Sequence, residues 1–457
     1  MSIKRILIAN RGEIAARIIR TCRTLGIETV LAASQADRDS VPARLADRTL
    51  CIGPARASES YLRAELIVQA ALGSGADAIH PGYGFLSERA VLARLAEQHG
   101  VIFIGPTAAQ IDAVGDKLQA RAIAQAAQVP VVPGGAVESE AAAAELARSI
   151  GAPLLVKAVG GGGGRGMKLV EDLQALSAAL ALASSEAGAA FGDARVYLER
   201  FLRHGRHVEV QVLGDGRGAV IHLGERDCSV QRRYQKLIEE TPAPGLSAEL
   251  RSRLHRSAVR YAQALEYRGA GTVEFLVDAA HETFYFLEMN ARIQVEHPVT
   301  EAVSGIDLVA EQIAIASGAG LRLTQADVQL RGSAIECRIN AEDPVRDFQP
   351  SPGQVRSVRW PDGPGIRVDT HIEPLSRVPP YYDSLLAKII AHGAARSEAL
   401  ARLSQAIEST RLEGIATNLP FHRTVLADPE FQAGGVDTGY VARLLAGAPR
   451  IAETAHG

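Results

Sequence analysis

One segment of the chain alternates polar and apolar residues over most of its length. Residues 284–300 read FYFLEMNARIQVEHPVT, and every second residue from position 288 to 296 is polar: Glu288, Asn290, Arg292, Gln294 and Glu296. Because side chains of a β-strand alternate between its two faces, a strand here would place carboxylates, amides and a guanidinium on one surface. A solvated strand face explains the alternation, but not the mixed charges in an otherwise apolar stretch. The segment therefore favours a strand whose carboxylates hold a metal ion and whose arginine holds an anion.

Length and composition restrict the class of protein. A chain of 457 residues exceeds a single hydrophobic core, and 47% hydrophobic with 22% charged residues is typical of a globular protein with several domains. The net charge of −3 gives no footprint for nucleic acid, and no run approaches the roughly 18 apolar residues of a spanning helix. The N-terminus lacks the features of a signal peptide, and the four cysteines have no metal-ligand spacing. We therefore expect a cytoplasmic protein without nucleic-acid or membrane partners.

Residues 1–115 alternate strand-like and helical patterns, which predicts a parallel sheet with helices on its faces. The turn after the first expected strand reads Asn10-Arg11-Gly12-Glu13, which is not the G-x-G-x-x-G fingerprint of a dinucleotide site. This weighs against a nicotinamide or flavin enzyme. The expected strands cover residues 3–9, 29–33, 77–80 and 101–105.

The pattern changes at residue 116. Residues 116–331 begin with an alanine-rich helix, pass a Pro- and Gly-containing hinge at 129–135, and include a small unit at about 132–204. Residues 332–450 form a last segment with Pro-rich turns. The expected helices cover residues 117–128, 141–150, 173–190 and, as the final helix, 397–408. The expected strands cover residues 154–158, 167–170, 207–213, 219–226, 272–277 and 283–289.

A glycine-rich loop joins two expected strands of the small unit. Six of the seven residues at positions 160–166 are glycine, and each costs the folded state roughly 0.4–1 kcal/mol relative to alanine. A flexible linker would tolerate this cost, but linkers seldom carry lysine and arginine at fixed places inside a strand pair. We favour a mobile flap whose backbone N–H groups close over phosphates, with Lys117 and Lys157 as point charges. It is not a Walker loop, since no G-K-[ST] and no helix follow it.

A pair of acidic residues suggests a divalent metal. Glu274 and Glu288 lie in two expected strands separated by residues 278–282, and a hairpin would place both acids at one end. At about 4 Å two carboxylates repel by roughly 4 kcal/mol at an effective dielectric constant of 20. A bound cation would remove that cost, and Mg²⁺ prefers a few carboxylate oxygens together with phosphate. Glu274, Glu288 and Asn290 suit this requirement.

Two further clusters are charged. Taken alone, the run from Glu225 to Lys236 predicts a solvated charged loop. Arg338 lies in a strand pattern within residues 334–344, where an unpaired guanidinium would be costly. A buried ion pair with Glu336 or Glu342 is the structural alternative to a functional role for Arg338.

Together these segments resemble the biotin carboxylases, the ATP-grasp components of biotin-dependent carboxylases. The resemblance runs from residue 8 to residue 388, and the run EMNARIQVEHPVTE is very specific. The other matching stretches are IANRGEIAARI, IHPGYGFLSE, GDK at 115–117, GGGGGRGM, RHVEVQV, ERDCSVQRR, GAGTVEF, ECRINAEDP and PPYYDSLLAK.

The resemblance implies an α/β fold with a parallel-sheet, Rossmann-like N-terminal domain (1–115), an ATP-grasp domain (116–331) whose lid spans about 132–204, and a C-terminal domain (332–450). It also implies a ligand for each part of the site. ATP would be held by Lys117, Lys157, Gly163, Gly164, Glu199, Arg200, Phe201, Leu202, His207, Gln231, Tyr234, Glu274 and Glu288. Two Mg²⁺ or Mn²⁺ ions would be held by Glu274, Glu288 and Asn290. Bicarbonate would be held by Lys236, Arg292, Gln294, Val295 and Glu296, and biotin would lie near Tyr83 and Arg338.

The resemblance further implies a mechanism with Arg292, Glu296, Arg338 and Lys236 as catalytic residues. Glu296 would take the bicarbonate proton, so that the anion attacks the γ-phosphoryl group of ATP to form carboxyphosphate. Carboxyphosphate would break down to CO₂ and phosphate, and phosphate would deprotonate the biotin ureido nitrogen. Arg338 would stabilise the enolate oxygen while that nitrogen attacks CO₂.

Biotin must come from another chain, because carriers offer lysine within Met-Lys-Met and this sequence contains only Met167-Lys168-Leu169. We expect a separate biotin carboxyl carrier protein and a carboxyltransferase as partners. The final acceptor stays open between acetyl-CoA, another acyl-CoA and pyruvate. The reaction would thus be the first half-reaction of acetyl-CoA carboxylase, in fatty acid synthesis, or of a related carboxylase.

Three departures from the family pattern are visible. Tyr234 stands where the family usually has histidine, and the hairpin between Glu274 and Glu288 is about two residues longer than usual. A bulky aromatic at the family's dimer contact is missing near residues 363–365, although we still expect a homodimer. Two alternative hypotheses are another ATP-grasp ligase of the carbamoyl-phosphate type and a non-catalytic nucleotide-binding regulator.

Overall fold

The computed structural model describes residues 3–160 and 167–447, so the predicted flap residues Gly163 and Gly164 lie outside the described residues. The N-terminal region confirms the expected parallel sheet, with strand order β3-β2-β1-β4-β5. The strands are β1 (Arg5–Ile8), β2 (Glu28–Ala33), β3 (Arg48–Cys51), β4 (Ala78–His80) and β5 (Ile102–Phe103). The helices are α1 (Gly12–Thr24), α2 (Val41–Leu45), α3 (Ala64–Ser74), α4 (Ala90–Gln98) and α5 (Ala108–Gly115).

Two polar residues, Glu13 and Tyr83, follow the carboxyl ends of β1 and β4. In open parallel sheets, ligand sites lie beyond the carboxyl ends of the strands. The chain leaves β1 toward Glu13 in α1 and leaves β4 toward Tyr83, and the Tyr83 hydroxyl donates a hydrogen bond to the Glu13 carboxylate. Two segments that are 70 positions apart therefore meet at this edge.

An eight-stranded sheet forms the centre of the molecule, in the order β14-β13-β10-β11-β12-β15-β22-β20. Neighbouring strands run antiparallel. The strands are β10 (Arg206–Asp215), β11 (Val220–Arg232), β12 (Gln235–Thr241), β13 (Arg268–Asp278), β14 (Thr283–Asn290), β15 (Ser333–Asn340), β20 (Ile366–Thr370) and β22 (Leu385–Gly393). The helices of the central region are α6 (Lys117–Ala126), α9 (Ala248–Ala264), α10 (His297–Ser304) and α11 (Leu308–Ala316).

This sheet joins the central and C-terminal parts of the chain. Strand β12 pairs with β15, with Glu239 opposite Glu336, so β15, β22 and β20 extend the same sheet. Helix α9 packs on β10 and β11, and Tyr261 of α9 lies against Phe286 of β14 with ring centroids 4.5 Å apart. The domain boundaries given above stay predictions.

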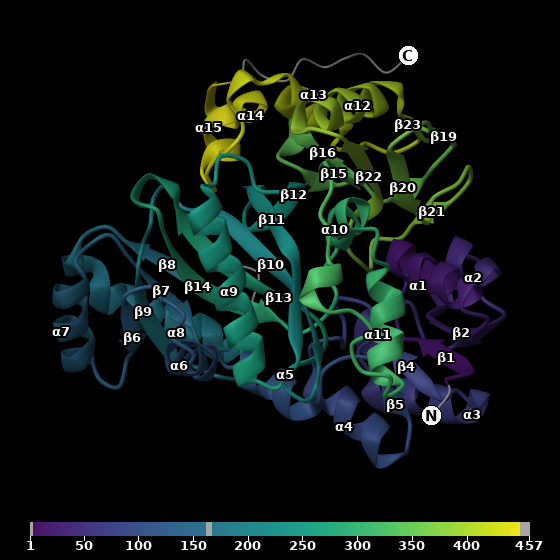
Figure 1. Ribbon diagram of the computed structural model, residues 1–457, viewed down its shortest axis with the longest axis horizontal. Helices are drawn as coiled ribbons and strands as arrows, with labels where there is room; N and C mark the ends of the chain where they lie inside the picture. The colour runs from purple at the N-terminus through teal and green to yellow at the C-terminus, as the bar shows by residue number, and fades with distance from the viewer. Residues whose placement is uncertain (1–2, 161–166, 448–457) are drawn as a thin grey trace.

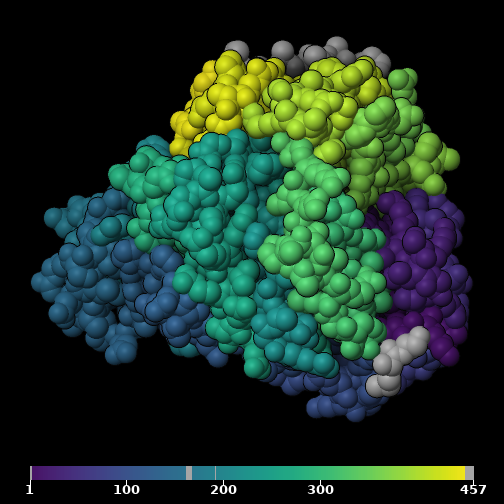
Figure 2. All heavy atoms as spheres, in the orientation of Figure 1, coloured from purple at the N-terminus to yellow at the C-terminus, as the bar shows by residue number. Residues whose placement is uncertain are grey.

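A four-stranded sheet in the order β6-β9-β7-β8 forms a separate small unit with its own apolar core. This unit projects from one side of the molecule (Figures 1 and 2). It corresponds to the predicted lid. Its elements are β6 (Gly134–Ala136), α7 (Glu140–Ile150), β7 (Leu154–Ala158), β8 (Met167–Val170), α8 (Leu176–Phe191) and β9 (Val196–Arg200).

The C-terminal region packs a helix, α12 (Arg396–Ser409), against β22 and β15, and it also contains small two-stranded ladders (Figure 1). The short strands are β16 (Glu342–Asp343), β17 (Gln349–Pro350), β18 (Gly353–Gln354), β19 (Ser357–Arg359), β21 (Arg377–Val378) and β23 (Arg411–Glu413). The helices are α12 (Arg396–Ser409), α13 (Leu419–Ala427), α14 (Pro429–Ala433) and α15 (Tyr440–Gly447). The helix expected at 397–408 is present, but it is not the final one. Within 3–160 and 167–447, no helix is long and apolar enough to cross a membrane.

Two further expectations about secondary structure were wrong. Strand β14 ends at Asn290, and residues 291–296 form bends and turns before α10, so the alternating segment is not one continuous strand. Pro298 cannot donate to a strand ladder and is favoured in the first turn of a helix, where it lies. The charged run from Glu225 to Lys236 is also no solvated loop, because it forms the turn and adjoining parts of the β11–β12 hairpin, much of it buried.

Candidate active site

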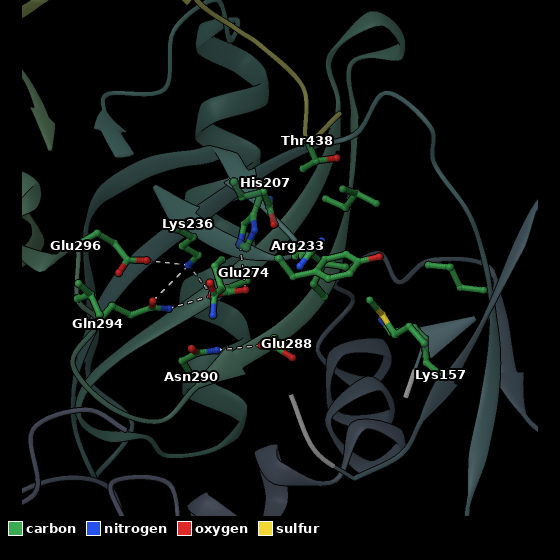
Figure 3. A pocket seen from close by; sticks show the side chains of 18 of the residues that line it. Lys157, His207, Arg233, Lys236, Glu274, Glu288, Asn290, Gln294, Glu296 and Thr438 are labelled. Carbon is green, nitrogen blue, oxygen red and sulfur yellow. Dashed lines mark hydrogen bonds and ion pairs between the residues drawn. The ribbon is translucent and has the colours of Figure 1, made fainter. Parts of the chain in front are cut away.

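A cleft of about 840 Å³ lies between the lid, the central sheet and the C-terminal region. Every predicted site residue within the described part of the chain lines this cleft. In Figure 3, Lys157 of the lid lies at one side, Gln294 and Glu296 lie at the other, and Glu274 and Glu288 lie between them. The predicted site residues that line the cleft are Tyr83, Lys117, Lys157, Glu199, Arg200, Phe201, Leu202, His207, Gln231, Tyr234, Lys236, Glu274, Glu288, Asn290, Arg292, Gln294, Val295, Glu296 and Arg338.

The ammonium of Lys236 is the centre of a buried charge network. Its Nζ lies 2.5 Å from Glu209 Oε2, 2.8 Å from Glu296 Oε1 and 3.0 Å from Glu274 Oε1. Burial alone would lower the pKa of Lys236, but the three carboxylates raise that pKa well above its ordinary value. Lys236 therefore stays charged, and it neutralises acids contributed by β10, β13 and the segment after β14.

Glu296 is fully buried between two cations. Its second oxygen, Oε2, accepts a hydrogen bond of 2.9 Å from Arg338, and the Arg338 Nε donates at 2.6 Å to Glu239. Burial would raise the pKa of Glu296, but Lys236 and Arg338 together lower it far below its ordinary value. The structural alternative for Arg338 named the wrong partners, because the guanidinium pairs with Glu239 and Glu296 rather than with Glu336 or Glu342.

Arg292 is oriented by the N-terminal domain. Its Nε donates at 2.8 Å to Glu88, and the other oxygen of Glu88 accepts from the backbone N–H of Ala291 at 3.0 Å. A second guanidinium nitrogen donates at 2.7 Å to the side-chain oxygen of Asn290. These contacts hold the turn segment after β14 in the shape that aims Arg292 into the cleft.

The predicted hairpin is present, and it brings the two acids together. Glu274 and Glu288 are direct partners across β13 and β14, with a bulge immediately after Glu274. His207 Nε2 lies 2.9 Å from Glu274, which raises the pKa of the imidazole despite the opposing effect of burial. Potential ligand atoms of His207, Glu209 and Glu274 lie within 4.8 Å of one another. The predicted ligands Glu274, Glu288 and Asn290 all line the cleft, and their carboxylate and amide oxygens are donors of the kind that Mg²⁺ prefers, so these residues fit a divalent ion.

The lid end of the cleft combines one ion-paired cluster with apolar walls. Glu199 accepts from Lys157 at 2.8 Å and from Arg121 at 2.6 Å, so both of its carboxylate oxygens are engaged. Burial opposes the charge on Lys157, but Glu199 raises the pKa of this amine. The apolar side chains that line this part of the cleft are Val132, Leu155, Met167, Phe201, Leu202, Leu276 and Leu287.

Tyr234 lies at the tip of the β11–β12 hairpin. The loop between Arg232 and Gln235 has only two residues, and both have left-handed backbones, with φ of 49° at Arg233 and 65° at Tyr234. Paired left-handed residues match the twist of a two-residue hairpin, although asparagine and glycine adopt them at lower cost. The turn leaves Tyr234 57% exposed at the cleft.

Sequence reasoning missed the residues that hold the site in place. Glu209 lies in the RHVEVQV stretch, where its position opposite Glu274 follows only from the pairing of β10 with β13. Glu88, Arg121 and Glu239 reach the site from segments distant in sequence. Among them, only Glu209 had a local signal, since an acid inside an apolar strand demands a cationic partner.

Comparisons with known proteins identify the relatives of this fold. The family models "Biotin carboxylase, N-terminal domain", "Carbamoyl-phosphate synthase L chain, ATP binding domain" and "Biotin carboxylase C-terminal domain" match residues 2–111, 116–324 and 336–443. A biotin carboxylase from Nostoc sp. is 51% identical over 96% of this chain and 99% of its own.

Two solved structures give the same result. A biotin carboxylase–βγ-ATP complex from Campylobacter jejuni has a TM-score of 0.94 at 46% identity, covering 97% of this chain and 99% of that chain. The biotin carboxylase domain dimer of Hydrogenobacter thermophilus 2-oxoglutarate carboxylase, with MgADP, ADP and bicarbonate, has a TM-score of 0.93 at 43% identity, covering 97% and 98%.

The three-part fold and its charged cleft define an ATP-dependent ligase with an ATP-grasp central domain. The chain belongs to the biotin carboxylase family, and its activity is the ATP-dependent carboxylation of biotin.

Proposed function

We propose that the cleft activates bicarbonate by phosphoryl transfer from ATP and then carboxylates biotin carried by a separate protein. One observation carries this proposal: Lys236, Glu296 and Arg338 form a connected acid–base unit, and Glu296 lies at the opposite side of the cleft from Lys157 (Figure 3). The nucleotide would bind at the end of the cleft that contains Lys157, and the anion would bind at the end that contains Glu296. This arrangement supports attack of a bound anion on the terminal phosphoryl group.

Glu296 is the proposed base for bicarbonate. Its depressed pKa keeps it ionised in the free protein, which makes it a weak base while Lys236 and Arg338 both contact it. An anion that competes for these two cations would raise the pKa of Glu296 toward the value that proton transfer needs. Arg292 and Lys236 then hold the anion, and Gln294 and the Val295 peptide complete its site. The bicarbonate oxygen forms a bond to the γ-phosphorus as ADP leaves, giving carboxyphosphate.

Glu274, Glu288 and Asn290 are the residues proposed to hold two divalent ions, Mg²⁺ or Mn²⁺. Glu288 supports this role because its side chain is 35% exposed and its nearest ionic contact is Lys117 at 4.0 Å. The Asn290 amide donates to Glu288 at 3.3 Å while Asn290 Oδ1 accepts from Arg292. Magnesium, when bound, neutralises charge on the nucleotide phosphates.

The nucleotide would lie along the lid. Lys117, Lys157, His207 and Gln231 are proposed for its phosphates and polar groups, and the apolar side chains of this end favour a stacked base. Both carboxylate oxygens of Glu199 are already hydrogen-bonded, which indicates that Glu199 positions Lys157. Any contact with the adenine base would be made by the backbone of residues 199–202. Tyr234, at the exposed hairpin tip, would contact the nucleotide from the opposite wall.

The second stage would use Arg338 and Tyr83. Once Glu296 is protonated, Arg338 loses its ionic partner on that side while Glu239 still fixes its Nε. The freed guanidinium nitrogen can stabilise the ureido oxygen of biotin as phosphate removes the N–H proton and the nitrogen attacks CO₂.

The proposed assembly extends beyond this chain. We propose a biotin carboxyl carrier protein and a carboxyltransferase as partners in the cytoplasm, and a homodimer, which the dimeric Hydrogenobacter relative supports. The final acceptor stays open between acetyl-CoA, another acyl-CoA and pyruvate.

ATP cleavage tests the proposal directly. ADP release by the purified protein with MgATP should require bicarbonate and rise when free biotin is added. Arg338→Met should remove the rise with biotin, whereas Arg217→Met, in an exposed loop, should leave it intact. ATP cleavage by the unmodified protein that does not depend on bicarbonate, or that does not accelerate when biotin is added, would contradict the proposal.

A further inference from the structure

A buried lysine outside the described site contacts the backbone of the proposed bicarbonate segment. Lys388 lies in β22 with 0% exposure, and its Nζ donates a hydrogen bond of 2.8 Å to the carbonyl oxygen of Val295. An ammonium has three donors and no acceptor, so a buried one is retained only where several oxygens surround it. Here Glu13 Oε2 lies 3.2 Å away and Asp369 Oδ2 lies 4.0 Å away.

The Glu13 carboxylate connects Lys388 to another part of the cleft. Glu13 lies in the first turn of α1 and is 3% exposed. One of its oxygens faces Lys388, and the other accepts the hydroxyl hydrogen of Tyr83, which lines the cleft. Lys388 is therefore linked to the Val295 peptide directly and to the Tyr83 hydroxyl through one carboxylate.

The segment that Lys388 contacts depends on such anchors. Residues 291–296 have neither helical nor strand hydrogen bonding, yet they carry Arg292, Gln294 and Glu296. Glu88 fixes the beginning of the segment at the N–H of Ala291. Near its end, His297 Nδ1 lies 2.8 Å from the carbonyl of Gln294, and Lys388 binds the next carbonyl, that of Val295.

The surrounding elements favour a fixed position for this amine. Strand β22 contacts both α1 and α10, so Lys388 lies where the N-terminal, central and C-terminal parts of the chain meet (Figure 1). Asp369, on the neighbouring strand β20, is already paired with Arg367 at 2.7 Å. If Lys388 served only to pair with Asp369, its Nζ would not need to donate a hydrogen bond to the Val295 carbonyl oxygen.

We infer that Lys388 is a positioning residue whose single ammonium sets both the Val295–Glu296 peptide for bicarbonate and the Tyr83 hydroxyl for biotin. The inference rests on the proposed function of these two parts of the cleft. It assigns a role in the reaction to a residue that touches neither substrate. Loss of Lys388 should therefore raise the KM for bicarbonate and for biotin, while nucleotide binding at the lid is preserved.

Lys388→Met keeps the length of the side chain and removes its charge and donors. We expect the KM for bicarbonate and the KM for biotin each to rise at least about tenfold, as for loss of a charged hydrogen bond, with less than about a twofold change for MgATP. Lys4→Met is the matched control because Lys4 is exposed, and all three constants should stay unchanged. Values for bicarbonate and biotin within twofold of the unmodified protein would overturn the inference.

Two further variants separate positioning from folding. Glu13→Gln/Lys388→Met removes both charges, so its thermal midpoint should recover relative to Lys388→Met while both KM values stay raised. Glu13→Met alone removes the acceptor of the Tyr83 hydroxyl and leaves the Val295 contact in place, so only the KM for biotin should rise. Recovery of both KM values together with stability in the double variant, or an unchanged biotin KM in Glu13→Met, would overturn the inference. If the unmodified protein lacks bicarbonate-dependent ATP cleavage, the proposed function fails instead.

Discussion

Replacing Lys236 with methionine should destabilise the protein in a way that depends on pH and on divalent ions. The substitution removes the ammonium that lies 2.5–3.0 Å from three buried carboxylates. Oxygens of two of them, Glu209 and Glu274, lie within 4.8 Å of each other, and at an effective dielectric constant of 20 these charges repel by at least about 3.5 kcal/mol.

Part of this repulsion stays compensated, because each acid keeps one other cationic or imidazole contact. Arg226 remains 2.6 Å from Glu209, Arg338 remains 2.9 Å from Glu296, and His207 remains 2.9 Å from Glu274. Removing one partner of a buried ionic cluster typically costs about 3–5 kcal/mol. For a cooperative unit of about 200 residues, this corresponds to a fall of roughly 10 °C in Tm.

The pH dependence follows from the sign of the pKa changes. Lys236 lowers the pKa of Glu274 and of Glu296, so its loss must raise both. A raised pKa in the folded state favours folding at low pH and is unfavourable as pH rises. The loss of stability in Lys236→Met should therefore be larger at about pH 8.5 than at about pH 5.5.

Thermal unfolding with and without magnesium measures this effect. Mg²⁺ without nucleotide should raise the Tm of Lys236→Met more than that of the unmodified protein, because a cation can replace the ammonium. Lys168→Met is the control, since the exposed pair of Lys168 with Glu186 contributes at most about 1 kcal/mol. A loss of Tm in Lys236→Met that is independent of pH and of Mg²⁺ would refute this reasoning.

Three other variants test separate parts of the site. Glu296→Ala should abolish bicarbonate-dependent turnover while calorimetry with an ATP analogue shows little loss of nucleotide binding; equal loss of both would make Glu296 structural. Burial raises the pKa of Glu239 to about 7, so its contribution to stability is lost as pH rises through 7. Glu239→Gln should flatten the fall of Tm between about pH 4.5 and pH 7, and an unchanged slope there would contradict this. Tyr234→Ala should change the KM for ATP by less than about tenfold, because the ring is 57% exposed, and a larger effect would show a buried contact in the complex.

Local patterns predicted much of the architecture. Alternating strand and helix signals gave the parallel N-terminal sheet, and two apolar strands around a short polar stretch gave the hairpin that pairs Glu274 with Glu288. These features depend on residues close together in sequence. The same reasoning failed beyond Asn290, because polar alternation continued into a segment that has no ladder partner.

The supporting contacts could not be predicted because they join distant segments. Arg292 and Glu88 are 204 positions apart, and Arg338 and Glu239 are 99 positions apart. A run of charges such as 225–236 is typical of an exposed loop unless other strands supply counterions. Here Glu209 of β10 pairs with the fully buried Arg226, and no spacing within the run indicates that partner.

Bicarbonate labelled with ¹⁸O tests the central claim most directly, because the proposed attack transfers one of its oxygens to phosphorus. Phosphate released during turnover should carry one labelled oxygen for each ATP cleaved in the presence of biotin. Phosphate without the label, released while carboxybiotin accumulates, would show that ATP is cleaved without transfer to bicarbonate and would contradict the account.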